Sequence, residues 1–326
     1  MTPGHRWQAP VPALWRCLAP ALIAVVCGGC VPTDAGSPGG GGSYEILLVR
    51  DGALYAMRPD GTMIRPIAAW LSGCREPQGS PDGRHIAVCT GRFIYMLDRD
   101  GSDAHAVAGP VPESGPVFPN WAADGRHLAF TGDDLKPHVV DLDAEMRSAN
   151  ERQYGRATGL WPGTPSYYGP TQTLLFADFS LSALAEPVTV AEDGTGLAPV
   201  FWTQPSPIGI GSSRRPAISP DGQTMLFEND ARGGYDIYLA DLLQGEICCL
   251  TEADAPLAEG DDGPWDRNTC PRFTPDQRAI YESTRPLGDS AEHVAQIWVH
   301  NLAFGERPLT SSTVASHTPG ILVAVR

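Results

Sequence analysis

Short apolar runs separated by tight-turn residues recur along most of this chain. The clearest example begins at Pro216, turns at Ser219-Pro-Asp-Gly222, and continues through 224–227 and 235–239 to 247–250. In such a turn, Pro pre-sets the backbone angle φ, and Gly accepts the positive φ that closes the hairpin. β-Branched, aliphatic and aromatic residues in runs of this length are typical of strands. The segment therefore predicts a four-stranded antiparallel meander.

The same unit recurs at similar intervals. Its turn positions are 81, 123, 170, 220 and 275, so neighbouring units are 42, 47, 50 and 55 residues apart. Further strands are expected at 44–49, 53–57, 64–69, 85–89, 93–97, 127–131, 138–142, 174–177, 187–191, 279–282 and 296–300. A four-stranded unit repeated every roughly 40 to 50 residues is the signature of a β-propeller blade. No window shows sustained helical periodicity, so the predicted fold class is all-β.

The first unit differs from the others because it lacks an innermost strand. Five complete units and this incomplete one indicate a six-bladed β-propeller of four-stranded antiparallel blades over residues 44–326. The apolar run 321–325, at the far end of the chain, has no obvious partner of its own. We expect it to complete the first blade and close the ring, because closure hides exposed sheet edges.

Residues 1–30 have the parts of an export signal. Two arginines precede an apolar core at 18–26, which is too short to span a bilayer. Gly29 lies directly before Cys30, and a small residue before a Cys resembles the lipobox of bacterial lipoproteins, in which the Cys is diacylated and becomes the new N-terminus. Cys27 stands where that family usually has Leu. Ordinary cleavage of a secretory signal, or a retained segment, therefore stays open.

Residues 31–43 carry no apolar pattern and include four consecutive glycines at 39–42, as expected of a flexible tether. Such a tether would hold a globular head away from a membrane surface. Val31, and not Asp, follows Cys30. By resemblance to lipoprotein sorting in bacteria with two membranes, this implies the outer membrane. We therefore expect a lipid-anchored protein at the periplasmic face of the outer membrane or at the cell surface.

The repeat resembles that of a known family. The order of Ser-Pro-Asp-Gly, an aliphatic and aromatic strand, the strand Asp236-Ile-Tyr and an Asp-Gly turn is similar to the WD-related repeat of TolB-type six-bladed propellers, over about residues 44–326. The resemblance implies a protein that joins envelope assemblies through protein contacts. TolB-type proteins are not usually lipidated, so the lipobox and the tether set this chain apart.

Charge narrows the choice of partners. The net charge is −15 at pH 7, and loss of the leader with its two arginines would make the mature chain about two units more acidic. Such a field repels phosphate backbones, so nucleic acid is not an expected partner. Lys136 is the only lysine, which leaves little scope for lysine-based catalysis.

An exported protein can keep disulfides. Cys74 and Cys89 flank the turn at Pro81-Asp82, and their numbers sum to 163, as required of residues that face each other across a two-residue turn. A bulge at Gly83 would move this register by one residue and make the pair diagonal. With that alternative open, we predict a disulfide between Cys74 and Cys89.

A second disulfide is a weaker prediction. Cys270 could reach Cys249, or its neighbour Cys248, on the outer strand of the preceding blade. A metal site at the cysteines is not expected, because no Cys-x-x-Cys spacing and no nearby pair of His residues occurs.

The longer connections of the predicted propeller fall on one face. In a meander blade, the turns between strands one and two and between strands three and four share a face, and all other connections lie on the opposite face. The second group contains the long segments 147–165, 179–186, 203–214, 228–234, 251–269 and 283–294. Long loops on a rigid scaffold are the usual place for binding.

The connection 251–269 is the main candidate for partner binding. It carries Glu252, Asp254, Glu259, Asp261, Asp262 and Asp266 around Trp265. An acidic lip with an aromatic anchor suits a basic or polar partner, or a cation. A solvated surface loop would have the same composition, so that interpretation stays open. Residues 98–103 resemble a calcium loop, but they lack its terminal Glu and fall where the repeat needs a turn.

We assign no catalytic residue, metal or cofactor. The segment 288–292 departs from the nucleophile elbow, and no residues are left for a separate hydrolase domain. The expected function is a monomeric, non-enzymatic binding or scaffolding module for an envelope protein or a peptidoglycan-associated partner, attached to the membrane by a lipid anchor. The alternative is a propeller lyase or hydrolase that uses a metal or carboxylates in its central funnel. A cluster of His and acidic side chains at one mouth of the channel would favour this alternative.

Overall fold

The computed structural model of the chain describes the greater part of the predicted propeller. The described residues are 44–113, 117–154, 165–168, 173–178, 186–191, 195–196, 198–200, 211–231, 234–251, 268–285, 287, 294–301, 305–311 and 315–323. All of them lie in the compact unit Gly41–Arg326. Within them, no helix has the length and apolar character needed to cross a membrane.

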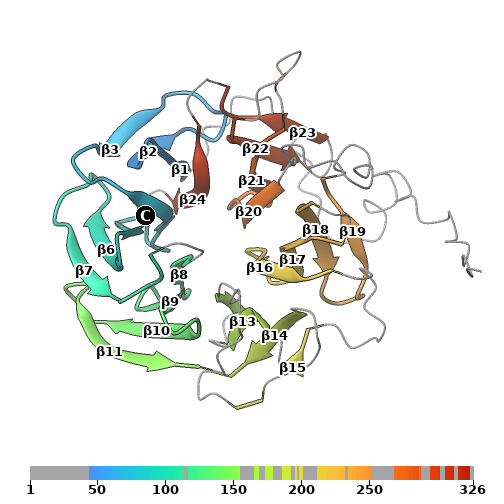
Figure 1. Cartoon of the computed structure of the whole chain (residues 1–326), viewed down its shortest axis with the longest axis horizontal. Helices are drawn as coiled ribbons and strands as arrows, with labels where there is room; N and C mark the ends of the chain where they lie inside the picture. Colours follow the sequence, from blue (N-terminus) through green and yellow to red (C-terminus); the bar gives the residue numbers. More distant parts are fainter. Residues whose placement is uncertain are drawn as a thin grey trace, which may run out of the picture. The chain divides into compact units, whose positions relative to one another are not determined.

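The described residues form six four-stranded antiparallel sheets, the blades, arranged in a ring (Figure 1). The blades are numbered in chain order, and their strands are given from the axis outward. Blade 1 contains β24 (His317–Val323), β1 (Tyr44–Arg50), β2 (Ala53–Met57) and β3 (Arg65–Ala68). Blade 2 contains β4 (Cys74–Gly79), β5 (His85–Thr90), β6 (Phe93–Asp98) and β7 (His105–Ala108). Blade 3 contains β8 (Asn120–Trp121), β9 (His127–Thr131), β10 (Pro137–Leu142) and β11 (Ser148–Gln153).

The second half of the ring follows the same order. Blade 4 contains β12 (Ser166–Tyr168), β13 (Thr173–Asp178), β14 (Glu186–Val190) and β15 (Ala198–Pro199). Blade 5 contains β16 (Ser213–Ile218), β17 (Thr224–Asn229), β18 (Asp236–Asp241) and β19 (Ile247–Cys249). Blade 6 contains β20 (Asn268–Phe273), β21 (Ala279–Ser283), β22 (Gln296–Asn301) and β23 (Gly305–Pro308). The predicted all-β, six-bladed fold is confirmed.

The ring is closed by the end of the chain. Strand β24 pairs with β1 in antiparallel register, with Tyr44 opposite Val323 and Ile46 opposite Ile321. The first blade is therefore completed by the C-terminal strand, as the apolar run 321–325 predicted. The strand begins earlier than that run, at His317.

The Ser-Pro-Asp-Gly turns are held by the side chains that define the repeat. In blade 5, Ser219 Oγ donates a hydrogen bond to Asp221 Oδ1 (2.6 Å) and accepts one from the Thr224 N–H (3.0 Å). The Ser219 N–H donates to the Thr224 carbonyl (2.9 Å), so the loop contains the four residues 220–223. The corresponding turn of blade 2 has the same bonds. These hairpins therefore differ from the two-residue turns assumed from the sequence.

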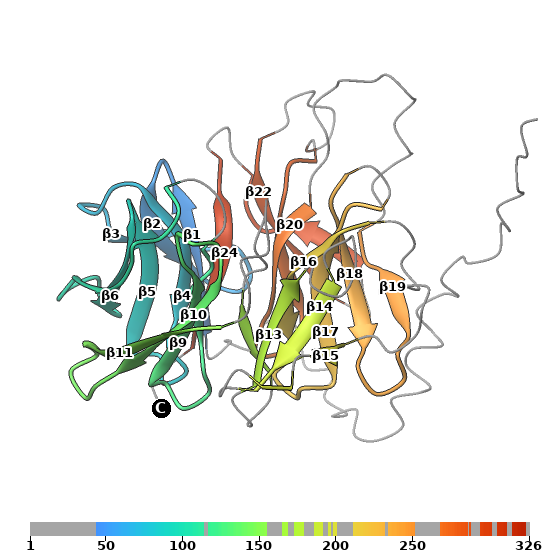
Figure 2. The same ribbon diagram turned by 60° about the horizontal axis from the view of Figure 1, so that its bottom comes forward.

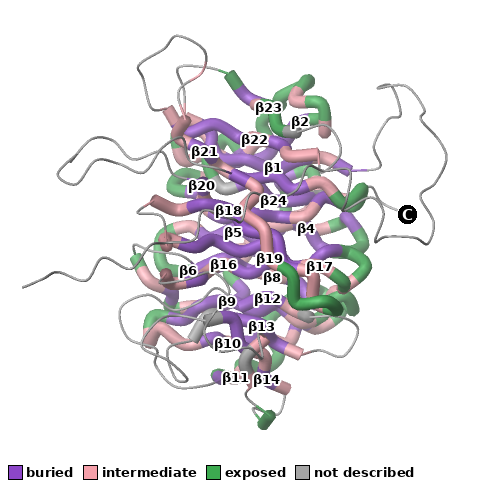
Figure 3. Tube along the Cα trace, turned by 90° about the vertical axis from the view of Figure 1, so that its right-hand side faces the viewer, coloured by how far each residue is buried: buried purple, intermediate pink, exposed green. Residues whose placement is uncertain are grey.

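The core lies between the blades. Each pair of neighbouring blades encloses one cluster of buried apolar side chains. Leu47 and Ile86, for example, pack between blades 1 and 2, and Phe227 packs with Leu175 between blades 5 and 4. Both faces of a blade are therefore covered, which explains why the middle strands are apolar at successive positions. Figure 3 shows long buried stretches on these strands, in purple.

The two ends of the strands form two different faces. In the tilted view of Figure 2, the strands of neighbouring blades stand side by side. The loops from first to second strand and from third to fourth strand meet at one end, here called the tight-turn face. The connections between blades and the loops from second to third strand meet at the other end, here called the connection face. The innermost strands run from the connection face to the tight-turn face.

Candidate functional site

The predicted Cys74–Cys89 disulfide is not formed, because both residues are buried free thiols. The four-residue loop and a bulge at Glu76-Pro77 place Cys89 opposite Arg75, one residue away from Cys74. Successive residues of a strand point to opposite faces. Cys74 therefore packs between blades 1 and 2, and Cys89 packs between blades 2 and 3. Burial raises the pKa of Cys74 to about 11 and that of Cys89 to about 12.

The second predicted disulfide, between Cys249 and Cys270, is also contradicted. Cys270 is a buried free thiol on β20, the innermost strand of blade 6. Cys249 lies on β19, the outermost strand of blade 5. Three strand spacings separate the edges of a blade by on the order of 14 Å, which is beyond the reach of a disulfide.

The other site predictions fall outside the described residues. Cys30, with the signal and the tether, lies in 1–43, and the acidic connection lies in 252–267. The acidic connection contains Glu259, Asp261, Asp262, Trp265 and Asp266. The roles predicted for these residues stay predictions.

Four innermost segments share a backbone feature that precedes a proline. Glu76, Phe118, Arg215 and Cys270 have φ values of 55, 43, 52 and 58°. In β4, β16 and β20, this residue and the proline together oppose a single residue of the next strand, which is a β-bulge. A positive φ outside Gly costs on the order of 1–3 kcal/mol. Bulges re-aim side chains, and the three bulged residues Glu76, Arg215 and Cys270 lie close enough to act on one another's charge.

Glu228 links the innermost strands of blades 5 and 6. Its fully buried carboxylate accepts hydrogen bonds from Arg214 Nε (2.7 Å), Arg215 Nη1 (2.7 Å) and the backbone N–H of Cys270 (2.6 Å). Burial is the largest single effect and would lower the pKa of Arg215, but the charge and hydrogen bond of Glu228, together with Cys270 and Glu76, raise the pKa overall. Two guanidinium groups share one carboxylate, and this arrangement leaves positive charge near the axis.

Glu76 makes a similar link between blades 2 and 3. Its Oε2 accepts hydrogen bonds from the backbone N–H groups of Val117 and Phe118, each at 2.8 Å. Burial raises the pKa of Glu76, and these two hydrogen bonds oppose the shift. The segment that leads into β8 is therefore fixed by a side chain of the neighbouring blade.

The Arg272 guanidinium reaches across the axis. Its Cζ lies 5.1 Å from the ring centroid of Phe118, which belongs to the opposite blade of the ring. The Cζ of Arg215 lies 4.8 Å from the same centroid, so both distances are within the range of cation–π contacts. Arg272 is only 6% exposed, and its Nε has no hydrogen-bond partner. Among the described residues, no carboxylate forms an ion pair with it.

These residues form one axial cluster, which consists of Glu76, Phe118, Arg214, Arg215, Glu228, Cys270 and Arg272. Its three guanidinium groups outnumber its two carboxylates, whereas the whole chain has a net charge of −15. Guanidinium groups are therefore in excess within this cluster, and the Glu282 carboxylate beside it also acts on Cys270. Such a site is suited to an anionic group and unsuited to a cation. Within the described ranges, no three His, Cys, Asp or Glu side chains are close enough together to hold a metal ion.

A His–Glu pair lies above the cluster, toward the connection face. His317 Nδ1 of β24 is 3.1 Å from Glu282 Oε1 of β21. This hydrogen bond raises the pKa of His317. A His and a carboxylate at this end of the strands are two of the groups that the alternative propeller enzyme would use.

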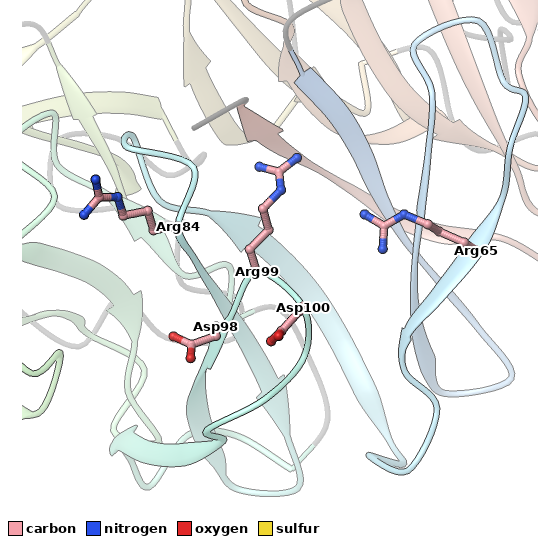
Figure 4. A pocket seen from close by; sticks show the side chains of 5 residues that line it. All are labelled: Arg65, Arg84, Asp98, Arg99 and Asp100. Carbon is pink, nitrogen blue, oxygen red and sulfur yellow. The ribbon is translucent and has the colours of Figure 1, made fainter. Parts of the chain in front are cut away.

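A second polar site is a surface crevice of about 430 Å³ on the tight-turn face, between blades 1 and 2. Figure 4 shows the side chains that line it, Arg65, Arg84, Asp98, Arg99 and Asp100. Glu45 pairs with both Arg65 (2.9 Å) and Arg99 (2.7 Å), and Arg99 also donates to the Gly83 carbonyl (2.9 Å). The positive charges of Arg65 and Arg99 in this crevice are therefore already paired with Glu45.

The axial cluster was not predicted, although the sequence contains a signal for it. In blades 2, 3, 5 and 6, a proline stands five residues before the Asp of the first turn, at Pro77, Pro119, Pro216 and Pro271. The residue before that proline is the one with positive φ. A search for positions that share this spacing would have brought Glu76, Phe118, Arg215 and Cys270 together.

Comparison with known proteins gives similarity in structure only. No protein-family model and no curated protein sequence matches the chain. TolB from Acinetobacter baumannii is similar over 87% of this chain and 67% of its own, with a TM-score of 0.64 and 16% identity. A protein assigned as TolB in Agrobacterium tumefaciens is similar over 85% of this chain and 91% of its own, with a TM-score of 0.58 and 14% identity.

A chain of a nidogen/laminin complex is similar over 87% of this chain and 100% of its own, with a TM-score of 0.61 and 10% identity. At such low sequence identity, structural similarity shows that the fold is shared but does not show that the function is shared. The chain is a six-bladed β-propeller with the same fold as TolB.

Proposed function

We propose that this chain is a non-enzymatic envelope lipoprotein whose propeller binds a protein partner at its connection face. The observation that carries the proposal is the difference between the two faces. The Ser-Pro-Asp-Gly loops of the tight-turn face are closed by their own side chains, as in 219–224. The strand ends that are joined by the long connections of blades 4 to 6 lie at the opposite face. Rigid scaffolds commonly present binding residues on such loops.

Two further observations support the proposal. Propellers with this fold include TolB and a chain found in a nidogen/laminin complex, and the latter is named for its association with another protein. A leader that ends at a lipidated Cys30, followed by a Gly-rich tether, would attach the propeller to a membrane and let it meet a partner. An envelope protein or a peptidoglycan-associated protein is the partner class that fits this location.

Partner capture from envelope extracts tests the proposal. Because Lys136 is the only lysine, carbodiimide coupling of this chain's many carboxylates to lysines of the partner is the suitable chemistry. We expect a defined partner to be recovered with the wild-type chain. We expect it to be lost when 252–267 is replaced by a Gly-Ser linker of equal length.

The bounds of this replacement follow from the structure. Thr251 Oγ1 accepts a hydrogen bond from the Ile237 N–H (2.8 Å), and Asn268 begins β20, so both must stay. A matched control keeps the length and Trp265 but changes Glu259, Asp261, Asp262 and Asp266 to Gln or Asn. Because the changed carboxylates are themselves coupling groups, both variants are compared by co-purification without cross-linker, and loss of the partner with the amide control then assigns binding to charge. Recovery of the same proteins with the Gly-Ser chain would exclude this connection as the docking site.

The anchor is tested separately. Replacement of Cys30 by Ala removes the thiol that would be acylated. We expect the variant to leave the membrane fraction and the wild-type chain to stay in it. Equal membrane association of the two would reject lipidation at Cys30 and leave the binding role of the propeller untouched.

A further inference from the structure

The Arg272 guanidinium is an unusual group to bury without a counter-ion. Arginine stays protonated in proteins, and removing a charge from water costs several kcal/mol per ion unless a partner repays it. Arg272 is 6% exposed and its Nε lacks a hydrogen-bond partner. Burial also lowers the pKa of Arg272, and the Glu76 and Glu228 carboxylates offset this effect only in part.

No neighbour forms an ion pair with Arg272 among the described residues, although the Glu76 and Glu228 carboxylates act on it at longer range. The Phe118 ring, 5.1 Å away, offers a cation–π contact, which is worth about 2 kcal/mol at a desolvated site. Arg215 contacts the same ring and adds positive charge. The Glu228 carboxylate is already used by Arg214, Arg215 and the Cys270 N–H. Glu76 accepts two backbone hydrogen bonds from the segment of blade 3.

We propose that the propeller axis is an oxyanion site, in which Arg272 binds a carboxylate or phosphate group of a small ligand and Phe118 and Arg215 fix its position. The planar guanidinium presents several N–H groups in one fork, which matches the geometry of both oxyanions. The ring of Phe118 holds the guanidinium by its face and leaves its edge available for hydrogen bonds.

Electrostatics favour this ligand class at the axis and disfavour it elsewhere on the chain. The net charge of −15 repels anions from most of the surface, whereas the cluster has more guanidinium groups than carboxylates. In the crevice of the tight-turn face, by contrast, Glu45 already pairs with Arg65 and Arg99. The site goes beyond the proposed protein-binding role, and neither proposal depends on the other.

Calorimetric titration of the purified full chain tests the proposal. The probes are sodium acetate and sodium phosphate, with sodium chloride at matched ionic strength as the reference. We expect saturable binding of at least one oxyanion and a matching rise of the melting temperature, with no such response to chloride. Tighter binding of acetate assigns a carboxylate ligand, and tighter binding of phosphate assigns a phosphate ligand.

Two variants locate the site. Arg272→Gln should weaken oxyanion binding at least about tenfold, because a charge-assisted hydrogen bond is lost. Arg285→Gln is the matched control, since Arg285 of the same blade also lies over an aromatic ring, that of Trp298 (4.3 Å), but is paired with Glu306. This control should bind oxyanions as the wild-type chain does.

Arg272→Lys keeps the charge and loses the fork, and it replaces Arg272→Gln if that variant does not fold. We expect it to bind more weakly than the wild-type chain. The proposal is overturned if the wild-type chain shows no saturable binding of either oxyanion. It is equally overturned if the Arg272 variants bind as tightly as the wild-type chain, or if Arg285→Gln loses as much affinity as they do.

Discussion

Glycine in the Asp-Gly turn of blade 2 is required for two separate reasons. Gly101 has φ +89°, which side chains other than Gly rarely adopt, and a Cβ built on it would lie 2.3 Å from the Ile67 carbonyl oxygen of blade 1. We predict that Gly101→Ala lowers the melting temperature strongly. The left-handed backbone costs roughly 1–2 kcal/mol, and the clash adds about 1–3 kcal/mol.

Gly245→Ala separates the cost of the left-handed backbone from the cost of the steric clash. Gly245 has φ +73° in the corresponding turn of blade 5, but nothing lies within 4 Å of a Cβ placed there. Denaturant unfolding should therefore show only the backbone cost at Gly245 and a clearly larger loss at Gly101. Equal losses of stability in the two variants would mean that the close approach of blade 1 to Gly101 does not add to the cost of Gly101→Ala.

Glu76 gives the protein a pH-dependent stability. Burial raises the pKa of its carboxyl above the ordinary value of 4.5, so the folded chain holds this proton more tightly than the unfolded chain. The resulting contribution to stability is present below pH 4.5 and is lost as the pH rises through the folded pKa. We predict that Glu76→Gln gains stability relative to the wild-type chain between pH 4 and pH 7.5.

Thermal unfolding of both chains over this pH range measures the effect. The Gln carbonyl can still accept the N–H groups of Val117 and Phe118, so the comparison isolates the charge. A difference in melting temperature that stays constant across the range would show that Glu76 does not titrate differently in the folded chain.

Single residues were predictable where the chemistry is local. The Ser, Pro, Asp and Gly of 219–222 interact with one another, so their sequence alone specifies a turn. The partner of Cys74 depends on the loop length and on the bulge at Glu76-Pro77, each of which moves the register. Two such shifts placed Cys74 and Cys89 on opposite faces of the blade. The contact of Arg272 with Phe118 crosses the ring, so it could not be predicted from the residues near Arg272 in the sequence.

At the scale of elements, neighbouring blades are joined by buried carboxylates as well as by apolar packing. Glu228 of β17 binds Arg214, Arg215 and the backbone of β20. We predict that Glu228→Gln destabilises the protein by about 3–5 kcal/mol, because two guanidinium groups then lose their counter-ion in a buried site. The midpoint of urea unfolding measures this loss.

Glu45→Gln is the matched control for this prediction. Glu45 also binds two arginines, Arg65 and Arg99, but its side chain is 22% exposed and that of Arg65 is 45% exposed. Solvent screens such a pair, so the expected loss is at most about 1 kcal/mol. If both variants lost the same amount, burial at the axis would not determine the strength of the Glu228 link.

Strands were predictable where the blade buries them. Residues 53–57 and 127–131 agree with β2 and β9, because buried strands consist of short apolar runs. The outer strand β11 was assigned to a connection, since its sequence Ser-Ala-Asn-Glu-Arg-Gln is polar and mostly exposed. An outer strand needs only backbone pairing with its neighbour, and backbone pairing leaves no apolar signature in the sequence.

At the scale of the whole molecule, the sequence repeats made the fold predictable. They did not reveal which side chains meet at the propeller axis. Six similar units with one missing strand leave few arrangements other than a closed ring. The axis, in contrast, receives the residue before a proline from each of several blades, and these residues are Glu, Phe, Arg and Cys. Their common backbone position tells nothing about which side chains will meet, because the meeting depends on all blades at once.

Closure of the ring connects the two ends of the propeller sequence, so its loss should affect every blade. Ile321 is buried between blades 6 and 1, and residues 321–323 pair with 44–46 of β1. A Cβ on Gly320 would lie 1.9 Å from the Pro77 carbonyl oxygen, so β24 also packs closely against blade 2. We predict that removal of 321–326 lowers the free energy of unfolding by about 5 kcal/mol, from one buried Ile and several ladder hydrogen bonds.

A loss of this size is comparable with the whole stability of many proteins, so the truncated chain should unfold as one unit near or below room temperature. Differential scanning calorimetry measures the transition. Removal of 324–326 alone is the control, because it keeps every pair of β24 with β1 in the described register. Because β24 contacts β4 of blade 2 and β20, β21 and β22 of blade 6, the removal weakens the packing of blade 1 against both neighbours. An unchanged transition after removal of 321–326 would mean that the blades hold together without the C-terminal strand.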